Sequence, residues 1–178
     1  MKNKKIKEEL LNKLKRAGIL HKEESMSRTG AKLDFYIDFK KVSGDPVLLE
    51  EVATCMLGLI SNEVTSIVAE GHGGIPLAVL ISQKLKKPLS LVRHKKRQHG
   101  TKKMIDGYLP RKNDKVLIID DVLRTGSSIK ESKEVLNSET DCKVVQAIVV
   151  VNRGEPVLKL DFPVNYLFDV EELFNSSY

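Results

Sequence analysis

The sequence predicts an α/β fold in which helices cover both faces of a central, mostly parallel sheet. Short apolar runs alternate along the chain with segments of helical pattern. These runs are apolar at nearly every position, which is typical of strands buried on both faces. Chemically distinctive polar segments follow several of the runs directly. With 178 residues, 41% of them hydrophobic and 30% charged, the chain fits a single domain over 1–178.

The predicted elements alternate between helices and strands. In order, they are a helix over 6–17, a strand over 34–42, a helix from Pro46 to about Ile60, a strand over 66–70, a turn over 71–74, a helix from Pro76 to about Lys86, strands over 89–93 and 115–121, a helix from Ser128, and strands over 143–153 and near 165–170.

Helix boundaries rest on periodicity and on capping residues. The first helix has a one-sided apolar stripe that ends at Gly18. Asp45 before Pro46 is typical of an N-cap followed by a proline at the first helical position. Ser128 with Glu131 fits a capping box.

Charge is concentrated in one segment. The net charge is +6, and residues 93–103 carry six Lys or Arg, two His and no acid. Such a run is typical of a segment that binds nucleic acid, of a solvated loop, or of a segment that binds a small polyanion. We expect no nucleic-acid partner, because the run has no interleaved aromatic residues and a strand, not a helix-turn-helix, follows the first helix.

The apolar runs are much shorter than the ~20 residues that a membrane span needs, and the basic N-terminus lacks the apolar region of a signal peptide. We therefore expect a cytoplasmic protein without membrane contact. Cys55 and Cys142 show no metal-binding spacing and are expected to be buried thiols.

Four distinctive segments are predicted to meet at one edge of the sheet. The glycine-rich turn 71–74, the basic segment, the acidic pair Asp120-Asp121 and the pair Asn152-Arg153 each follow a predicted strand. In parallel sheets, ligands bind outside the carboxyl ends of the strands. This edge is therefore the predicted binding site.

The segment after the acidic pair predicts a phosphate site. Residues 125–128, Thr-Gly-Ser-Ser, precede a helix, whose free N–H groups favour an anion. Carboxylates at Asp120 and Asp121 would accept hydrogen bonds from ribose hydroxyls, so the two features together describe a ribose 5-phosphate pocket. The simpler alternatives are an ordinary helix cap and a strand end with one acid solvated and one in an ion pair. The chain has no Walker A loop, and Pro76 replaces the third glycine of a dinucleotide-binding GxGxxG motif.

The stretch "VLIIDDVLRTGSS" resembles the phosphoribosyl pyrophosphate (PRPP) signature of the type I phosphoribosyltransferases. Three further segments resemble orotate phosphoribosyltransferases in particular. They are "GGIPLA" at 73–78, "VRHKKRQHGTKKMIDG" at 92–107 and "SRTGAKLDFYID" at 27–38. The resemblance covers about residues 5–155 in the same order.

The resemblance implies a role for each matching residue. The PRPP-binding residues that it implies are Arg93, His94, Arg97, His99, Asp120, Asp121, Arg124, Thr125, Gly126, Ser127 and Ser128. The implied pyrophosphate loop consists of His72, Gly73 and Gly74. The implied base-binding residues are Arg28, Tyr36, Arg124 and Arg153. Its catalytic residues are Arg97, His99 and Asp121.

The resemblance also implies the reaction and the organisation of the chain. Orotate would attack C1 of PRPP and displace pyrophosphate, with Mg²⁺ carried by PRPP and Asp120 as the one candidate protein ligand. Residues 1–42 would form a small N-terminal hood over the base, 45–155 the core, and 93–107 a mobile basic loop. A homodimer is expected.

The sequence departs from the family at several of these positions. Arg97 and Arg28 stand where lysine is usual, Gly73 stands where lysine is frequent, and Arg124 replaces a threonine. Two alternatives therefore stay open. One is transfer to a purine or uracil, which Arg124 favours, and the other is a PRPP-binding regulatory protein with little catalysis.

Overall fold

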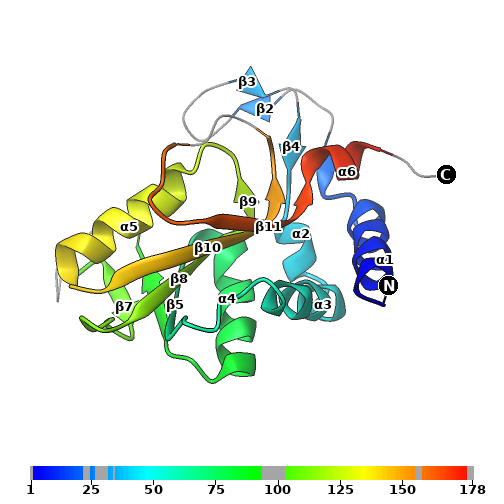
Figure 1. Ribbon diagram of the computed structural model, residues 1–178. Coiled ribbons are helices and arrows are strands. Elements are labelled where there is room, and N and C mark those ends of the chain that lie inside the picture. Colours follow the sequence, from blue (N-terminus) through cyan, green and yellow to red (C-terminus); the bar gives the residue numbers. More distant parts are fainter. Residues whose placement is uncertain are drawn as a thin grey trace.

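The computed structural model describes residues 2–21, 25–26, 32–33, 35–93, 103–154 and 158–175. A seven-stranded sheet lies at its centre (Figure 1). The strand order is β11 (Val164–Asp169), β10 (Lys143–Asn152), β8 (Lys115–Ile119), β5 (Ser66–Glu70), β6 (Leu89–Val92) and β7 (Ile105–Gly107), with β9 (Val122–Leu123) also paired to β10. Every pair is parallel except β6–β7. The predicted, mostly parallel sheet is confirmed.

Helices cover both faces of the sheet, as predicted. They are α1 (Lys2–Arg16), α2 (Lys40–Ser43), α3 (Pro46–Leu57), α4 (Gly71–Leu85), α5 (Ser127–Glu139) and α6 (Val170–Phe174). Leu117 and Ile119 of β8 belong to the hydrophobic cluster of α1, α3 and α4, whereas Ile118 belongs to the cluster of α5. This alternation explains why the strands are apolar at nearly every position, because each face needs its own set of side chains.

The N-terminal segment differs from its prediction. Instead of a strand over 34–42, the two-residue strand β4 (Tyr36–Ile37) pairs antiparallel with β1 (Leu20–His21), and α2 follows at once. Two further short strands, β2 (Ser25–Met26) and β3 (Lys32–Leu33), pair with each other. The prediction of a strand over 34–42 is wrong at its end, because Phe39 and Val42 are both buried and lie three residues apart, which is a helical spacing.

Two helices begin elsewhere than predicted. Residues 71–74 are the first turn of α4, not a separate turn, because Gly71 takes a φ of 76° and reverses the chain directly after β5. Helix α5 begins at Ser127 behind Gly126, whose φ is 80°, and it has no side-chain cap. The predicted capping box at Ser128 is therefore wrong.

Smaller differences concern elements that the sequence pattern did not indicate. Strand β7 and helix α6 were not expected, and α3 ends at Leu57, three residues early, before Gly58. The Asp45 cap is confirmed: its Oδ1 accepts hydrogen bonds from the N–H groups of Val47 and Leu48, both at 3.0 Å.

The two cysteines are free and only partly buried, so they are less buried than expected. Burial raises the pKa of both the Cys55 and the Cys142 thiol, which keeps them in the unreactive thiol form. Within the described ranges, no helix has the length and apolar character needed to cross a membrane.

Candidate functional site

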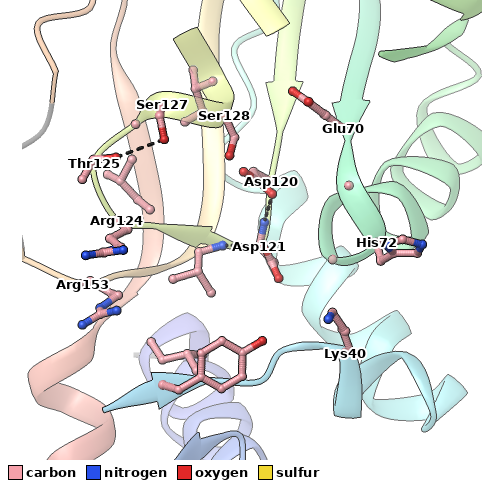
Figure 2. A pocket seen from close by; sticks show the side chains of 18 residues that line it. Lys40, Glu70, His72, Asp120, Asp121, Arg124, Thr125, Ser127, Ser128 and Arg153 are labelled. Carbon is pink, nitrogen blue, oxygen red and sulfur yellow. Dashed lines mark hydrogen bonds between the residues drawn. The ribbon is translucent and has the colours of Figure 1, made fainter. Parts of the chain in front are cut away.

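A cavity of about 440 Å³ opens at the carboxyl ends of β5 and β8 (Figure 2). Its walls come from β4, the start of α2, Glu70 with the first turn of α4, the segment 120–129, and Arg153. The volume is in the range of small-molecule sites. Three of the four segments that the sequence placed at one edge thus line one cavity.

The acidic pair forms the floor of this cavity. The N–H of Asp121 donates to Oδ1 of Asp120 at 2.9 Å, and the N–H of Val122 donates to Oδ1 of Asp121 at 2.9 Å. Loss of solvent around Asp120, then the neighbouring carboxylate of Asp121 and that of Glu70, raise the pKa of Asp120 well above its ordinary value. The Asp120 carboxyl group therefore keeps its proton to a higher pH than an ordinary aspartic acid does.

Glu70 is a third carboxylate that the sequence analysis missed. It ends β5, is only 4% exposed, and accepts a hydrogen bond from the Ser132 hydroxyl of α5 at 2.7 Å. This bond links the end of β5 to α5 across the cavity wall. The sequence held only part of the signal: Glu70 is the last residue of the predicted strand over 66–70, but its partner Ser132 is distant along the chain.

The turn before α5 presents donors to the cavity. Gly126 carries the chain into the helix with a positive φ, and the Thr125 hydroxyl donates to the Ser127 hydroxyl at 3.1 Å. The first N–H groups of a helix have no partner within the helix, so they are available to an anion. Thr125, Ser127 and Ser128 all line the cavity.

The first turn of α4 lies directly against the acidic pair. A Cβ atom on Gly73 would lie 1.9 Å from Oδ2 of Asp121, and one on Gly74 would lie 2.7 Å from the carbonyl oxygen of Ile119. Only glycine allows this approach. The N-terminus of α4 therefore reaches the floor of the cavity, with His72 beside it (Figure 2).

Two arginines lie together at the other end of the cavity. Figure 2 shows Arg124 and Arg153 side by side. The Arg153 guanidinium lies 4.1 Å from the centre of the Phe35 ring, which in turn packs edge-to-face on Phe174 of α6 at 5.0 Å. This stacking holds Arg153 in place. Tyr36 of β4 lines the same cavity.

Of the remaining predicted site residues, the structure describes Arg93 alone. Arg93 pairs with Asp106 of β7, and its N–H donates to the Met104 carbonyl at 2.9 Å, so it lies where the basic segment leaves and rejoins the sheet. It is not among the residues that line the cavity. Arg28, His94, Arg97 and His99 fall outside the described residues.

Lys40 is a second residue that the sequence analysis missed. It begins α2 and lines the cavity, on the side of His72 (Figure 2). The predicted strand over 34–42 concealed it, because the direction of a side chain in a strand differs from that in a helix.

The cavity offers oxygen ligands of the kind that Mg²⁺ prefers. Among the described residues, however, no group of three His, Cys, Asp or Glu side chains is arranged to hold a metal ion. The carboxylates present suit a cation that brings most of its own ligands, such as one already bound to phosphates.

Comparisons with known proteins agree on one family, the phosphoribosyltransferases. A family model described as a phosphoribosyl transferase domain matches residues 47–178. The orotate phosphoribosyltransferase of Methanocaldococcus jannaschii is 36% identical over 150 residues, which cover 84% of each chain. That of Pyrococcus horikoshii is 32% identical over 180 residues, covering 97% of this chain and 96% of that protein. The crystal structure of orotate phosphoribosyltransferase from Aeropyrum pernix matches with a TM-score of 0.76 and 26% identity, over 93% of this chain and 96% of that one.

The raised pKa of Asp120 makes stability depend on pH. Because the folded state holds the Asp120 proton more tightly than the unfolded state, the free energy of unfolding falls as pH rises from about 4, the ordinary Asp value, to the raised pKa. Asp120→Asn removes this penalty and keeps the acceptor for the Asp121 N–H. We expect its Tm at pH 7 to exceed that of the wild type by several degrees, with the gap closing toward pH 4.

Thermal unfolding between pH 4 and pH 8 checks this prediction. Asp141→Asn, at an exposed position, is the control and should match the wild type at every pH. An Asp120→Asn protein no more stable than the wild type at pH 7 would contradict the electrostatic account of the pair.

Proposed function

The chain belongs to the phosphoribosyltransferase family, and from this we propose that it is an orotate phosphoribosyltransferase of pyrimidine nucleotide biosynthesis. It transfers the 5-phosphoribosyl group of PRPP to orotate, giving orotidine 5′-phosphate and pyrophosphate. The observation that carries the proposal is the meeting of Asp120, Asp121 and the N-terminus of α5 in one cavity. The identity of 36% with the M. jannaschii enzyme supports the choice of base.

The sugar phosphate is assigned to the middle of the cavity. The 5′-phosphate accepts hydrogen bonds from the first N–H groups of α5 and from the hydroxyls of Thr125 and Ser127. The ribose hydroxyls bind Asp120 and Asp121. The carboxyl oxygens of both residues can accept hydrogen bonds from the ribose hydroxyls.

The reaction exchanges one bond at C1 of the ribose for another. A bond forms between a ring nitrogen of orotate and C1, and the bond from C1 to the diphosphate oxygen breaks, with its electron pair leaving on pyrophosphate. The sugar ring becomes positively charged in the transition state. The negative charges of Asp121 and Glu70 lie in the same cavity and stabilise that charge.

The diphosphate is assigned to the first turn of α4. The amides of His72, Gly73 and Gly74 are assigned to it there, and the basic loop between β6 and β7, with Arg93, His94, Arg97 and His99, is proposed to close over it and exclude water. Mg²⁺ bound to the diphosphate would supply charge neutralisation of the leaving group. The carboxylates of Asp120 and Asp121 suit contact with such an ion, directly or through water.

The orotate carboxylate is assigned to the arginine end of the cavity. A guanidinium group can pair with a carboxylate through two parallel hydrogen bonds, which fixes the orientation of the base. Arg153, held on Phe35, is placed for this role, with Arg124 beside it. Tyr36 and Arg28 of the N-terminal segment 1–42 complete the proposed base site.

The assembly and location of the protein are also proposals. A homodimer is proposed because, in the family that the sequence resembles, the mobile loop reaches the site of a partner subunit. A cytoplasmic location is proposed as well.

A second candidate is transfer to a purine or uracil. Arg124 favours this second candidate, because its large cationic side chain lines the cavity and takes up space that the base would use.

The choice of base is tested by incubating the full chain with PRPP, Mg²⁺ and one base at a time. We expect orotate to be consumed, with no consumption of adenine, hypoxanthine, xanthine or uracil, measured by ultraviolet absorbance. Consumption of another base in place of orotate would replace the first candidate by the second. A protein that consumes none of them, yet gains stability from PRPP, would be a PRPP-binding regulator.

The role of Arg153 is tested by Arg153→Met, which keeps much of the apolar contact with Phe35 and removes the charge. Loss of a charged hydrogen-bonding group costs about 1.5–3 kcal/mol. We therefore expect the KM for orotate to rise about tenfold or more, with the KM for PRPP nearly unchanged. Arg111→Met, in the loop before β8, should change neither. An equal rise in both KM values would contradict the assignment of Arg153 to the base.

A further inference from the structure

The diphosphate end of the cavity needs a positive charge that the first turn of α4 does not supply. Glu70 and Asp121 line the cavity on that side, beside Asp120, and negative charge on their carboxylates repels a diphosphate. The backbone amides of α4 offset only part of this, because a helix N-terminus is equivalent to about half a positive charge.

Helix α4 has no room for a cation on its own glycines. A side chain at position 73 would meet the Asp121 carboxylate, with a Cβ distance of 1.9 Å to Oδ2. One at position 74 would meet the backbone of β8, with a Cβ distance of 2.7 Å to the Ile119 carbonyl oxygen. A positive charge at this place must therefore come from another element.

Of the described Lys and Arg residues that line the cavity, Lys40 is the one on this side. Figure 2 shows its ammonium group pointing toward the region between Asp121 and His72, whereas Arg124 and Arg153 lie together at the opposite end. We propose that Lys40 binds the diphosphate of PRPP and stabilises it as it leaves. This inference rests on the proposed function.

The base of the Lys40 side chain is held firmly. Helix α2 is fixed to the core by Phe39 and Val42, which are 1% and 0% exposed and flank the lysine in sequence. The next residue, Lys41, has a structural use, since its Nζ donates to the Gly18 carbonyl at 3.0 Å. Among the described residues no hydrogen bond or ion pair holds Lys40, so its charge is available to a ligand.

Lysine suits the task because its ammonium group is a compact charge with three donors. Placed at the diphosphate, it gains strength as the charge on the leaving group grows. It therefore contributes to both binding and turnover. It does not touch the sugar phosphate, which lies beyond Asp121 at the start of α5.

The test measures the binding of pyrophosphate and of ribose 5-phosphate, each with Mg²⁺, to the full chain by calorimetry. We expect Lys40→Met to weaken pyrophosphate binding about tenfold, the effect of losing one charged hydrogen bond, and to leave ribose 5-phosphate binding unchanged. Lys40→Arg should restore most of the pyrophosphate affinity. Lys41→Met is the matched control and should bind both ligands as the wild type does.

Two outcomes would overturn the proposal for Lys40. One is a Lys40→Met protein that binds pyrophosphate as tightly as the wild type, and the other is an equal loss for both ligands, which would indicate a structural role. These outcomes leave the proposed function intact. A wild-type protein that binds neither ligand would overturn the proposed function together with the inference.

Discussion

The cavity depends on the close approach of the first turn of α4 to the end of β8. Gly73 and Gly74 make this possible, because a Cβ on either would collide with Asp121 or with the backbone of Ile119. The approach brings the N-terminus of α4 to one side of the acidic pair, and α5 begins on the other side, after Gly126. Two helix N-termini therefore face one pair of carboxylates. Neither the phosphate sites nor the ribose site could form if the two segments stood apart.

This arrangement separates charge along the cavity in the way that PRPP requires. The ligand carries phosphate groups at two ends and an uncharged sugar between them. Amides and hydroxyls lie where the phosphates are assigned, and the carboxylates lie in the middle. Burial of Asp120, together with the nearby carboxylates of Asp121 and Glu70, raises the pKa of Asp120. In the proposed function, the arginines at the far end select a base that carries its own negative charge.

The features that could be predicted from the sequence are those with a local cause. Strands apolar at nearly every position indicated a sheet covered on both faces, and Asp45 before Pro46 marked the start of α3. The pairing of Asp120-Asp121 with the turn at Thr125 and Gly126 located the cavity. What the sequence did not reveal depends on tertiary contacts. The helical α2 follows from the burial of Phe39 and Val42, so Lys40 could not be placed before the fold was known. Glu70 was overlooked because its partner, Ser132, is 62 residues away.

The central claim is that the acidic pair and the N-terminus of α5 hold one sugar phosphate between them. A crystal structure of the protein with ribose 5-phosphate tests it most directly. The account predicts the phosphate group on the N–H groups of residues 126–128 and the ribose hydroxyls within hydrogen-bond distance of Asp120 and Asp121. A ribose 5-phosphate bound with its phosphate at the first turn of α4, or outside the cavity, would contradict it.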